Sequence, residues 1–193
     1  MRPADREPLL QLLYDTGSFR EEEISVALEL FDDACAAAPA DGSELHPNHP
    51  GDRSSYRLVG LFTEPSTIEI SGSASRSPQP AASLTGYACY GPTPGTDGTF
   101  DLYWIAVHPS AQGTGGGRQL LREVEDRVSA AGGRMLIVET SSRADYEGTR
   151  RFYDRGGYRE GARVRDFYAP QDDRVIYTRR FPPRPVAGGV SQQ

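Results

Sequence analysis

Apolar residues recur at helical spacing near the start of the chain. Ser18 followed by Glu21 forms a capping-box pattern, which predicts the beginning of a helix. The apolar positions then lie three or four residues apart up to about Ala37: Ile24, Ala27, Leu28, Phe31 and Ala34. A shorter apolar segment, Pro8 to Tyr14, predicts one or two helical turns ahead of this helix.

Short runs of apolar and β-branched residues predict strands along the rest of the chain. In order they are Tyr56–Phe62, Thr67–Ile70, Leu84–Tyr90, Phe100–Val107, Met135–Glu139, Gly161–Tyr168 and Arg174–Phe181. The last two form a hairpin across residues 170–173. Residues 39–52 and 71–82 are rich in Pro, Gly, Ser or Ala and predict loops.

Two helices are predicted between these strands. One carries Leu120, Leu121, Val124 and Val128 at helical spacing and ends at Gly132-Gly133. The other is marked by Tyr146, Thr149, Phe152 and Tyr153 and ends at Gly156-Gly157. This order predicts a mixed α/β sheet with helices packed on it, in one domain over residues 1–181. Residues 182–193 are expected to form a disordered tail.

Composition removes several classes of function. The net charge is −6, which argues against a general nucleic-acid binder. All 21 basic residues are arginine, so lysine-based phosphate binding, Schiff-base chemistry and a lysine general base are excluded. The two cysteines, Cys35 and Cys89, and the three histidines have no metal-ligand spacing. No segment predicts a signal peptide or a membrane span, so we expect a cytoplasmic protein without a membrane partner.

A glycine-rich run, Gly113–Gly117, separates a predicted strand from a predicted helix. Successive backbone amides at a helix N-terminus form an anion site, and glycine allows close approach of a phosphate. A P-loop is excluded because it requires lysine. A dinucleotide-binding loop fits less well, because Arg118 stands at the last glycine position and His108–Gln112 lengthens the approach, although Glu139 imitates the required acid. A tight connection without a ligand is the remaining structural alternative.

The third interpretation rests on two motifs. Val107-His108-Pro109, then Gln112-x-x-Gly115-x-Gly117 and Leu120-Leu121, resembles the acetyl-CoA motif of the GNAT acetyltransferase superfamily. Residues 151–158, Arg-Phe-Tyr-Asp-Arg-Gly-Gly-Tyr, resemble the second hallmark of that family. The resemblance covers about residues 18–181. It implies a mostly antiparallel central sheet with splayed central strands and helices on both faces.

The same resemblance implies how acetyl-CoA would be held. The backbone of Ile105, Ala106 and Val107 would pair with the pantetheine arm and the acetyl carbonyl. The amides of Gln112, Gly113, Thr114, Gly115, Gly116 and Gly117 would bind the pyrophosphate, and Arg118 would either add charge near the phosphates or remain on a solvated helix face. The resemblance implies no metal.

Tyr153 matches the general acid of the family, which would protonate the departing thiolate. The structural alternative is a core tyrosine. The family often has an asparagine seven residues earlier, where this chain has Tyr146. Two carboxylates are candidates for the general base. Asp101 lies six residues before Val107 and, by alternation along a strand, would share a face with Tyr103, Ile105 and Val107; Glu139 ends the neighbouring strand.

The acceptor is expected to be a primary amine of a small molecule, such as an amino acid or an amine-bearing metabolite. The walls of the acceptor-binding site are predicted to come from residues 39–54, residues 65–82 and the final hairpin. Candidate aromatic lining residues are Tyr56, Tyr87, Tyr103, Trp104, Phe167 and Tyr168. Acetylation of a protein N-terminus or lysine, and a non-catalytic acyl-CoA-binding module, are the alternative functions. A homodimer, and an acyl group longer than acetyl, remain open at this stage.

Overall fold

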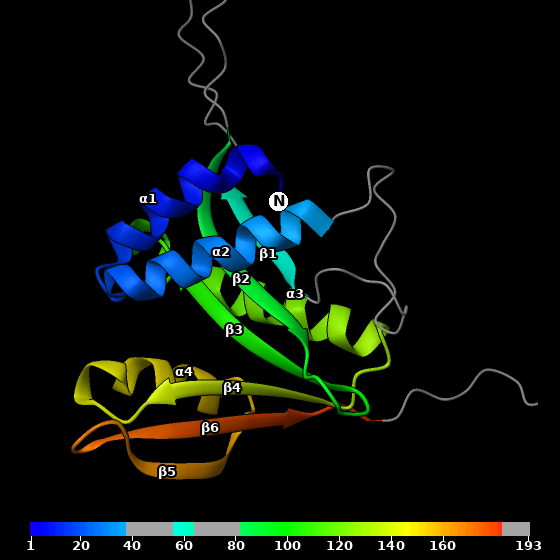
Figure 1. Ribbon diagram of the computed structural model, residues 1–193, viewed down its shortest axis with the longest axis vertical. Helices are drawn as coiled ribbons and strands as arrows, with labels where there is room; N and C mark the ends of the chain where they lie inside the picture. The colour runs from blue at the N-terminus through cyan, green and yellow to red at the C-terminus, as the bar shows by residue number, and fades with distance from the viewer. Residues whose placement is uncertain (38–55, 64–81, 183–193) are drawn as a thin grey trace, which may run out of the picture.

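The computed structural model describes residues 1–37, 56–63 and 82–182 (Figure 1). The helices are α1 (Arg6–Thr16), α2 (Glu21–Ala37), α3 (Gly116–Ala130) and α4 (Glu147–Arg155). Short 3-10 helices are η1 (Pro3–Asp5), η2 (Pro109–Ala111) and η3 (Ala144–Tyr146). The strands are β1 (Arg57–Thr63), β2 (Ser83–Pro92), β3 (Thr99–Val107), β4 (Met135–Ser141), β5 (Arg159–Ala169) and β6 (Asp172–Arg180).

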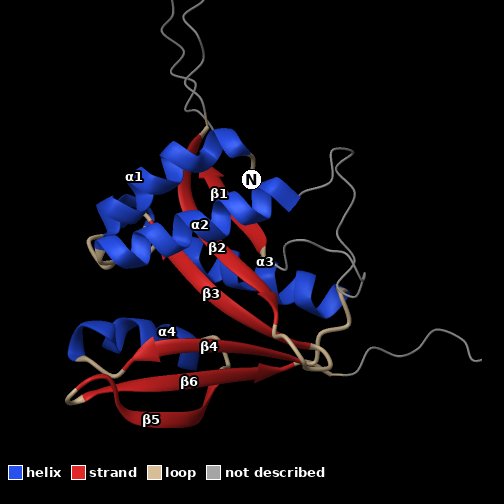
Figure 2. Ribbon diagram, viewed as in Figure 1, coloured by secondary structure: helices blue, strands red, loops and turns tan. Residues whose placement is uncertain are grey.

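One six-stranded sheet runs through the molecule in the order β1-β2-β3-β4-β6-β5. Four of the five neighbouring pairs are antiparallel, and β3–β4 is the parallel pair. Figure 2 shows that β1–β3 form one part of the sheet and β4–β6 another. The two parts meet at the end where β3 and β4 begin and diverge from there. The predicted mixed, mostly antiparallel sheet is therefore confirmed.

Helices cover both faces of this sheet. Apolar residues of α1 and α2, among them Leu9, Leu12 and Phe31, pack with Tyr87, Cys89 and Ala106 in one buried cluster. On the opposite face, α3 and α4 contribute Leu120, Val124 and Tyr153 to a second cluster that includes residues of β2, β3, β4 and β6. The second cluster crosses the boundary between the two parts of the sheet, and so it holds them in one body.

The connection from α1 to α2 differs from the sequence prediction. Helix α1 is longer than one or two turns and ends at Gly17, whose φ of 60° is left-handed and whose amide donates to the Tyr14 carbonyl. Helix α2 begins at Glu21, and the backbone amide of Arg20 donates to the Glu23 carboxylate at 2.8 Å. Ser18 does not cap α2 as predicted; its hydroxyl donates to the Thr16 carbonyl. The connection between α1 and α2 is short because the left-handed conformation of Gly17 ends α1 and changes the direction of the chain within one residue.

A β-bulge changes the facing of side chains along β3. Against β2, Trp104 pairs with Cys89 and Leu102 with the next residue, Tyr90, so Tyr103 is an extra residue. Leu102 therefore packs in the α3 and α4 cluster together with Ile105 and Val107, although their spacing is odd. Asp101 does not share a face with Ile105 and Val107, and the prediction from simple alternation was wrong.

Strands β3 and β4 separate where the bulge begins. Their paired residues run from Thr99 with Met135 to Leu102 with Val138. Beyond that point β3 continues to Val107 and β4 to Ser141 without a further pair between them. From Tyr103 onward β3 pairs with β2 and with no other strand among the described residues, and the splayed central strands are confirmed.

Most predicted elements match within a few residues. The strands that begin at Arg57, Ser83, Thr99 and Met135 and the helices α3 and α4 lie where the patterns placed them. The final hairpin closes more tightly than predicted, across Pro170-Gln171, with Gln171 at a φ of 66°. The predictions for residues 39–52, 67–70, 71–81 and the tail after residue 182 lie outside the described residues.

Gly133 provides a test of how tightly α3 is joined to the sheet. A Cβ at this position would lie 2.8 Å from the Val128 carbonyl oxygen and 3.1 Å from the Phe100 ring. We expect Gly133→Ala to lower the free energy of unfolding by about 1–3 kcal/mol, measured by chemical denaturation. Gly148→Ala in α4 is the matched control, because no heavy atom lies within 4 Å of its Cβ; its stability should stay constant or rise by up to about 1 kcal/mol. Equal losses in the two variants would contradict this account.

Candidate functional site

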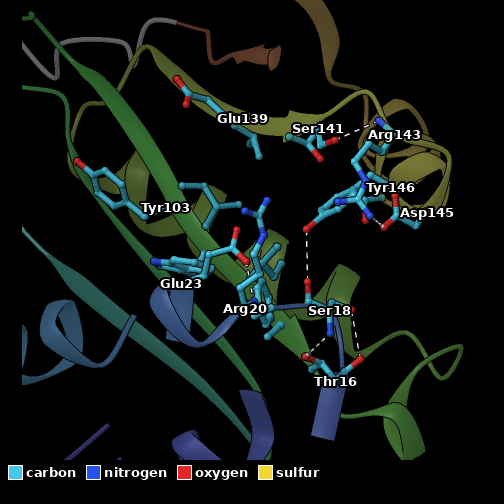
Figure 3. A pocket seen from close by; sticks show the side chains of 18 of the residues that line it. Thr16, Ser18, Arg20, Glu23, Tyr103, Glu139, Ser141, Arg143, Asp145 and Tyr146 are labelled. Carbon is cyan, nitrogen blue, oxygen red and sulfur yellow. Dashed lines mark hydrogen bonds and ion pairs between the residues drawn. The ribbon is translucent and has the colours of Figure 1, made fainter. Parts of the chain in front are cut away.

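A pocket of about 680 Å³ lies in the opening between β3 and β4 (Figure 3). Its walls come from the connection between α1 and α2, residues Leu102–Val107 of β3, the end of β4, η3 with α4, and the β5–β6 hairpin. The pocket therefore reaches both faces of the sheet. A ligand placed in it would contact the open backbone of β3 and side chains from both ends of the chain.

The open edge of β3 carries the residues expected to bind pantetheine. Ile105, Ala106 and Val107 all line the pocket. They pair with Ala88, Tyr87 and Gly86 of β2, and no strand pairs with their other edge within the described residues. Peptide groups on that edge can bind an extended amide-containing chain, as a strand would.

The glycine-rich loop forms the N-terminal end of α3. Gly113 and Gly115 have left-handed φ values of 76° and 96°, and nothing lies within 4 Å of a Cβ at either. Gly115 is the N-cap, and its carbonyl accepts the first helical bond, from the Gln119 amide. The backbone amides of residues 113–118, which come before Gln119, have no hydrogen-bond partner among the described residues. The turn thus presents free N–H groups beside open space, as an anion site requires.

Side chains of the loop hold its shape. The Gln112 side chain donates from Nε2 to the Val107 carbonyl at 3.0 Å, and the Thr114 hydroxyl donates to the Ala111 carbonyl at 2.7 Å. Gly116 is buried, and a Cβ there would lie 2.9 Å from Leu61 Cδ2. Arg118 is exposed and donates from Nη1 to the Arg155 carbonyl at the end of α4, at 3.3 Å. It therefore lies beside the loop and ties α3 to α4.

Tyr153 lies in α4 at the inner wall of the pocket. Only 3% of the residue is exposed, and its ring packs against Phe152, Tyr158 and Tyr177 at centroid distances of 5.2, 5.6 and 5.9 Å. Burial raises the pKa of the hydroxyl well above its ordinary value, so the group stays protonated at neutral pH. No described residue hydrogen-bonds with this hydroxyl. The geometry accommodates both a core tyrosine and a proton donor to the pocket.

The two candidate bases lie on the other face of the sheet. In β3 and β4, Leu102 and Val138 pair with each other and both pack toward α3. Asp101 and Glu139 are adjacent to them in sequence and so point away from α3. Glu139 lines the pocket and is ion-paired with Arg174. Asp101 does not line it directly, and its carboxylate accepts a hydrogen bond from the Thr93 hydroxyl at 2.7 Å.

The structure adds pocket residues that the sequence patterns did not indicate. Thr16, Gly17, Ser18, Phe19, Arg20 and Glu23 all come from the end of α1, the connection and the start of α2. Tyr146, which stands at the asparagine position of the family, spans the pocket and donates from its hydroxyl to the Ser18 carbonyl at 3.4 Å. Nothing in the sequence indicated that the connection between α1 and α2 faces β3.

The predicted aromatic lining is partly present. Tyr103, Trp104 and Tyr168 line the pocket, and Tyr56 contacts the Tyr103 ring. Tyr87 has no exposed surface and belongs to the core under α1 and α2, so its predicted place in the pocket was wrong. Phe167 lies over the Arg174 guanidinium at 4.8 Å. The final hairpin supplies Tyr168 and Asp172, as predicted, whereas residues 39–54 and 65–81 lie outside the described residues.

No group of three or more His, Cys, Asp and Glu side chains among the described residues is arranged to hold a metal ion. His108, beside the glycine-rich loop, is paired with Asp15 at 3.2 Å. Within the same residues, no helix has both the length and the apolar character needed to span a bilayer.

Comparisons with known proteins agree with this geometry. The family model for a GNAT acetyltransferase domain matches residues 80–160. A crystal structure from Desulfovibrio desulfuricans, assigned to the GNAT family of acetyltransferases, is 38% identical. The match covers 92% of this chain and 93% of that one, with a TM-score of 0.72. A search of curated proteins found no match.

More distant structures share the fold. An aminoglycoside 6'-N-acetyltransferase in complex with coenzyme A is 15% identical, with a TM-score of 0.62 over 95% of this chain and 94% of that one. The aminoglycoside 6'-N-acetyltransferase from Enterococcus faecium is also 15% identical, with a TM-score of 0.64 over the same shares. At this identity the likeness extends to the fold alone.

The environment of Asp101 predicts how its charge affects stability. Burial raises the pKa of this carboxyl, and the Thr93 hydroxyl partly offsets the effect. Because the folded pKa lies above the unfolded one, the ionised group destabilises the fold at neutral pH, and stability is regained as pH falls through the folded value. Asp101→Asn keeps the hydrogen-bond acceptor for Thr93, so we expect its Tm at pH 7 to exceed that of the wild type. The difference should shrink toward pH 4 in a calorimetric series.

Asp173 gives the opposite case for the same measurement. The Asp166 amide and the Arg163 guanidinium lower the pKa of its carboxyl. Asp173→Asn should therefore lower the Tm at pH 7, again with a difference that shrinks in acid. Two Asn variants that shift Tm in the same direction at pH 7 would contradict the assignment of these environments.

Proposed function

Because the chain belongs to the GNAT family of acetyltransferases, we propose that it transfers the acetyl group of acetyl-CoA to the primary amine of a small molecule. The observation that carries the proposal is a pocket lined by the strand edge at Ile105–Val107, by Gln112 at the start of the glycine-rich loop and by Tyr153. We infer that residues 1–181 act as one domain.

The residues present fit acetyl-CoA, which would supply an acyl group activated as a thioester. The first-turn amides of α3, with Gln112 shaping the loop, would hold the pyrophosphate where the helix dipole favours negative charge. Arg118, one residue after the loop, would add charge near the phosphates if its guanidinium left the Arg155 carbonyl. The edge of β3 would hold the pantetheine amides and orient the acetyl carbonyl. No metal is needed for this reaction.

The candidate base and the candidate acid lie on opposite faces of the sheet. On the face away from α3, Glu139 or Asp101 would take a proton from the incoming ammonium, directly or through water. The amine nitrogen then bonds to the carbonyl carbon as the carbon–sulfur bond breaks. On the face toward α3, Tyr153 would give its proton to the leaving sulfur, and the second proton that the nitrogen releases would restore the Tyr153 hydroxyl through solvent. Base and acid thus lie on opposite sides of the carbonyl, which suits direct attack in a ternary complex.

The size and lining of the pocket favour a small acceptor. Tyr146 and Ser18 close the pocket on the side of α4, and Tyr168 covers it from the hairpin. A volume of about 680 Å³ is within the range of small-molecule sites. We therefore favour a small-molecule amine over a protein N-terminus or lysine as the acceptor.

The loop assignment is tested with two matched glycines. Gly115→Leu places a side chain in the open space of the loop, and we expect the Kd for acetyl-CoA in isothermal titration calorimetry to rise about 10- to 100-fold. Gly95→Leu is the control: it has a similar φ of 72° and open surroundings, but lies in the β2–β3 turn. Both variants should lose similar stability from left-handed backbone strain. An unchanged Kd in Gly115→Leu would overturn the assignment.

The catalytic role of Tyr153 is tested by removing one oxygen atom. Tyr153→Phe should lower kcat by about 100-fold or more, with the Kd for acetyl-CoA nearly constant, when free CoA release is followed over a panel of amines. Tyr158→Phe is the control in the same aromatic cluster, because its hydroxyl donates to Glu125 at 3.0 Å and does not face the pocket. Equal kcat in the wild type and Tyr153→Phe would leave Tyr153 a core residue.

A wild-type protein that binds CoA but turns over no amine would favour the non-catalytic acyl-CoA-binding module.

A further inference from the structure

Arg20 is placed in the pocket but has no function in the scheme above. It is the last residue before α2, and its backbone amide is fixed by the Glu23 carboxylate at 2.8 Å. Figure 3 shows its side chain extending into the middle of the pocket, between Tyr103 and Tyr146 and below Glu139. Its guanidinium has no hydrogen bond and no ion pair with any described residue. A cation in this position is available to a ligand.

The turn that carries Arg20 is fixed on three sides. Gly17 ends α1 in the left-handed conformation. The Phe19 ring packs edge-on against Trp104 of β3 at a centroid distance of 5.2 Å. The Ser18 carbonyl accepts the hydroxyl of Tyr146 from η3. Arg20 is therefore presented from a held backbone, which lowers the entropy lost when its side chain binds a partner.

The other charged groups of the pocket already have partners. Arg143 is paired with Asp145 at 2.7 Å, Glu139 with Arg174, and Asp172 accepts the hydroxyl of Ser141. Of the two guanidinium groups among the described lining residues, that of Arg143 is ion-paired and that of Arg20 is not. Its planar guanidinium matches a carboxylate in a bidentate arrangement.

The charged residues that line the pocket indicate which kind of anionic ligand Arg20 would bind. Four carboxylates and two guanidinium groups line the described part of the pocket: Glu23, Glu139, Asp145 and Asp172, with Arg20 and Arg143. A phosphate dianion would be repelled by this excess of negative charge, whereas a zwitterion is matched at both ends. The ammonium end would lie toward Glu139 and the anionic end at Arg20.

We propose that the acceptor is an amino-carboxylic acid whose carboxylate is bound by Arg20. This inference rests on the proposed function and specifies its acceptor. Acetylation removes the positive charge of the amine and leaves the carboxylate, so the product keeps its contact with Arg20 and loses its attraction to Glu139. Arg20 then determines which amines are accepted and takes no part in proton transfer.

The test compares each of the twenty amino acids with its carboxamide, in which a neutral group replaces the carboxylate and the ammonium has a lower pKa, at a pH where both amines are mostly protonated. For the best substrate, wild-type kcat/KM should favour the acid over the amide by about 10- to 100-fold. Arg20→Gln should reduce this preference to near unity, mainly through KM, and Arg20→Lys should restore part of it. Arg6→Gln is the control arginine: it is exposed, paired with Asp32 at 2.9 Å, and should keep the wild-type preference.

Binding provides a readout that does not need turnover. In the presence of saturating CoA, N-acetylated amino acids should bind the wild type by calorimetry and bind Arg20→Gln about 10- to 100-fold more weakly. The Kd for acetyl-CoA should be the same in both proteins. Turnover of amides as efficient as that of acids, or a loss of acetyl-CoA affinity in Arg20→Gln, would overturn the role of Arg20 while leaving the acetyltransferase proposal intact. Failure of every amine to react would contradict the proposed function, and the binding result would still decide the role of Arg20.

Discussion

The separation of β3 from β4 is the constraint on which the rest of the structure depends. Two neighbouring strands pair from Thr99–Met135 to Leu102–Val138 and then diverge within one sheet. Divergence leaves peptide groups unpaired, which is costly unless a ligand or water binds them. The fold supports it by packing helices on both faces, with α1 and α2 on one and α3 and α4 on the other. The resulting opening lets one pocket reach both faces of the sheet.

In this arrangement, different kinds of groups would bind the two substrates. Groups suited to acetyl-CoA are mostly backbone: the open edge of β3 and the first turn of α3. Groups suited to an amine are side chains from segments distant in sequence: Arg20 near the start, Glu139 in the middle and Tyr168 near the end. Backbone contacts depend on conformation and tolerate changes of side chain, so the donor site can stay constant in a family while the acceptor site varies.

The sequence indicated the local features well and the tertiary ones less well. The strands, the glycine-rich loop and Tyr153 follow from periodicity and from a resemblance carried by short motifs, and the structure places them together. The facing of Asp101 could not be predicted, because the bulge at Tyr103 is defined by the register against Cys89 and Tyr90 of another strand. Arg20 was not indicated either, because its position depends on Phe19 packing against Trp104, a contact between residues far apart in sequence.

The bulge at Tyr103 has a consequence for how this family can change over time. Because Tyr103 is the extra residue, its loss would leave Leu102 and Trp104 paired with consecutive residues of β2, and Trp104 through Val107 would keep their present faces. A deletion at the bulge is thus absorbed without exchanging the two buried environments of β3, whereas a deletion inside a regular strand turns over the residues beyond it. An ungapped alignment across a relative without the bulge would pair residues that face opposite sides of the sheet.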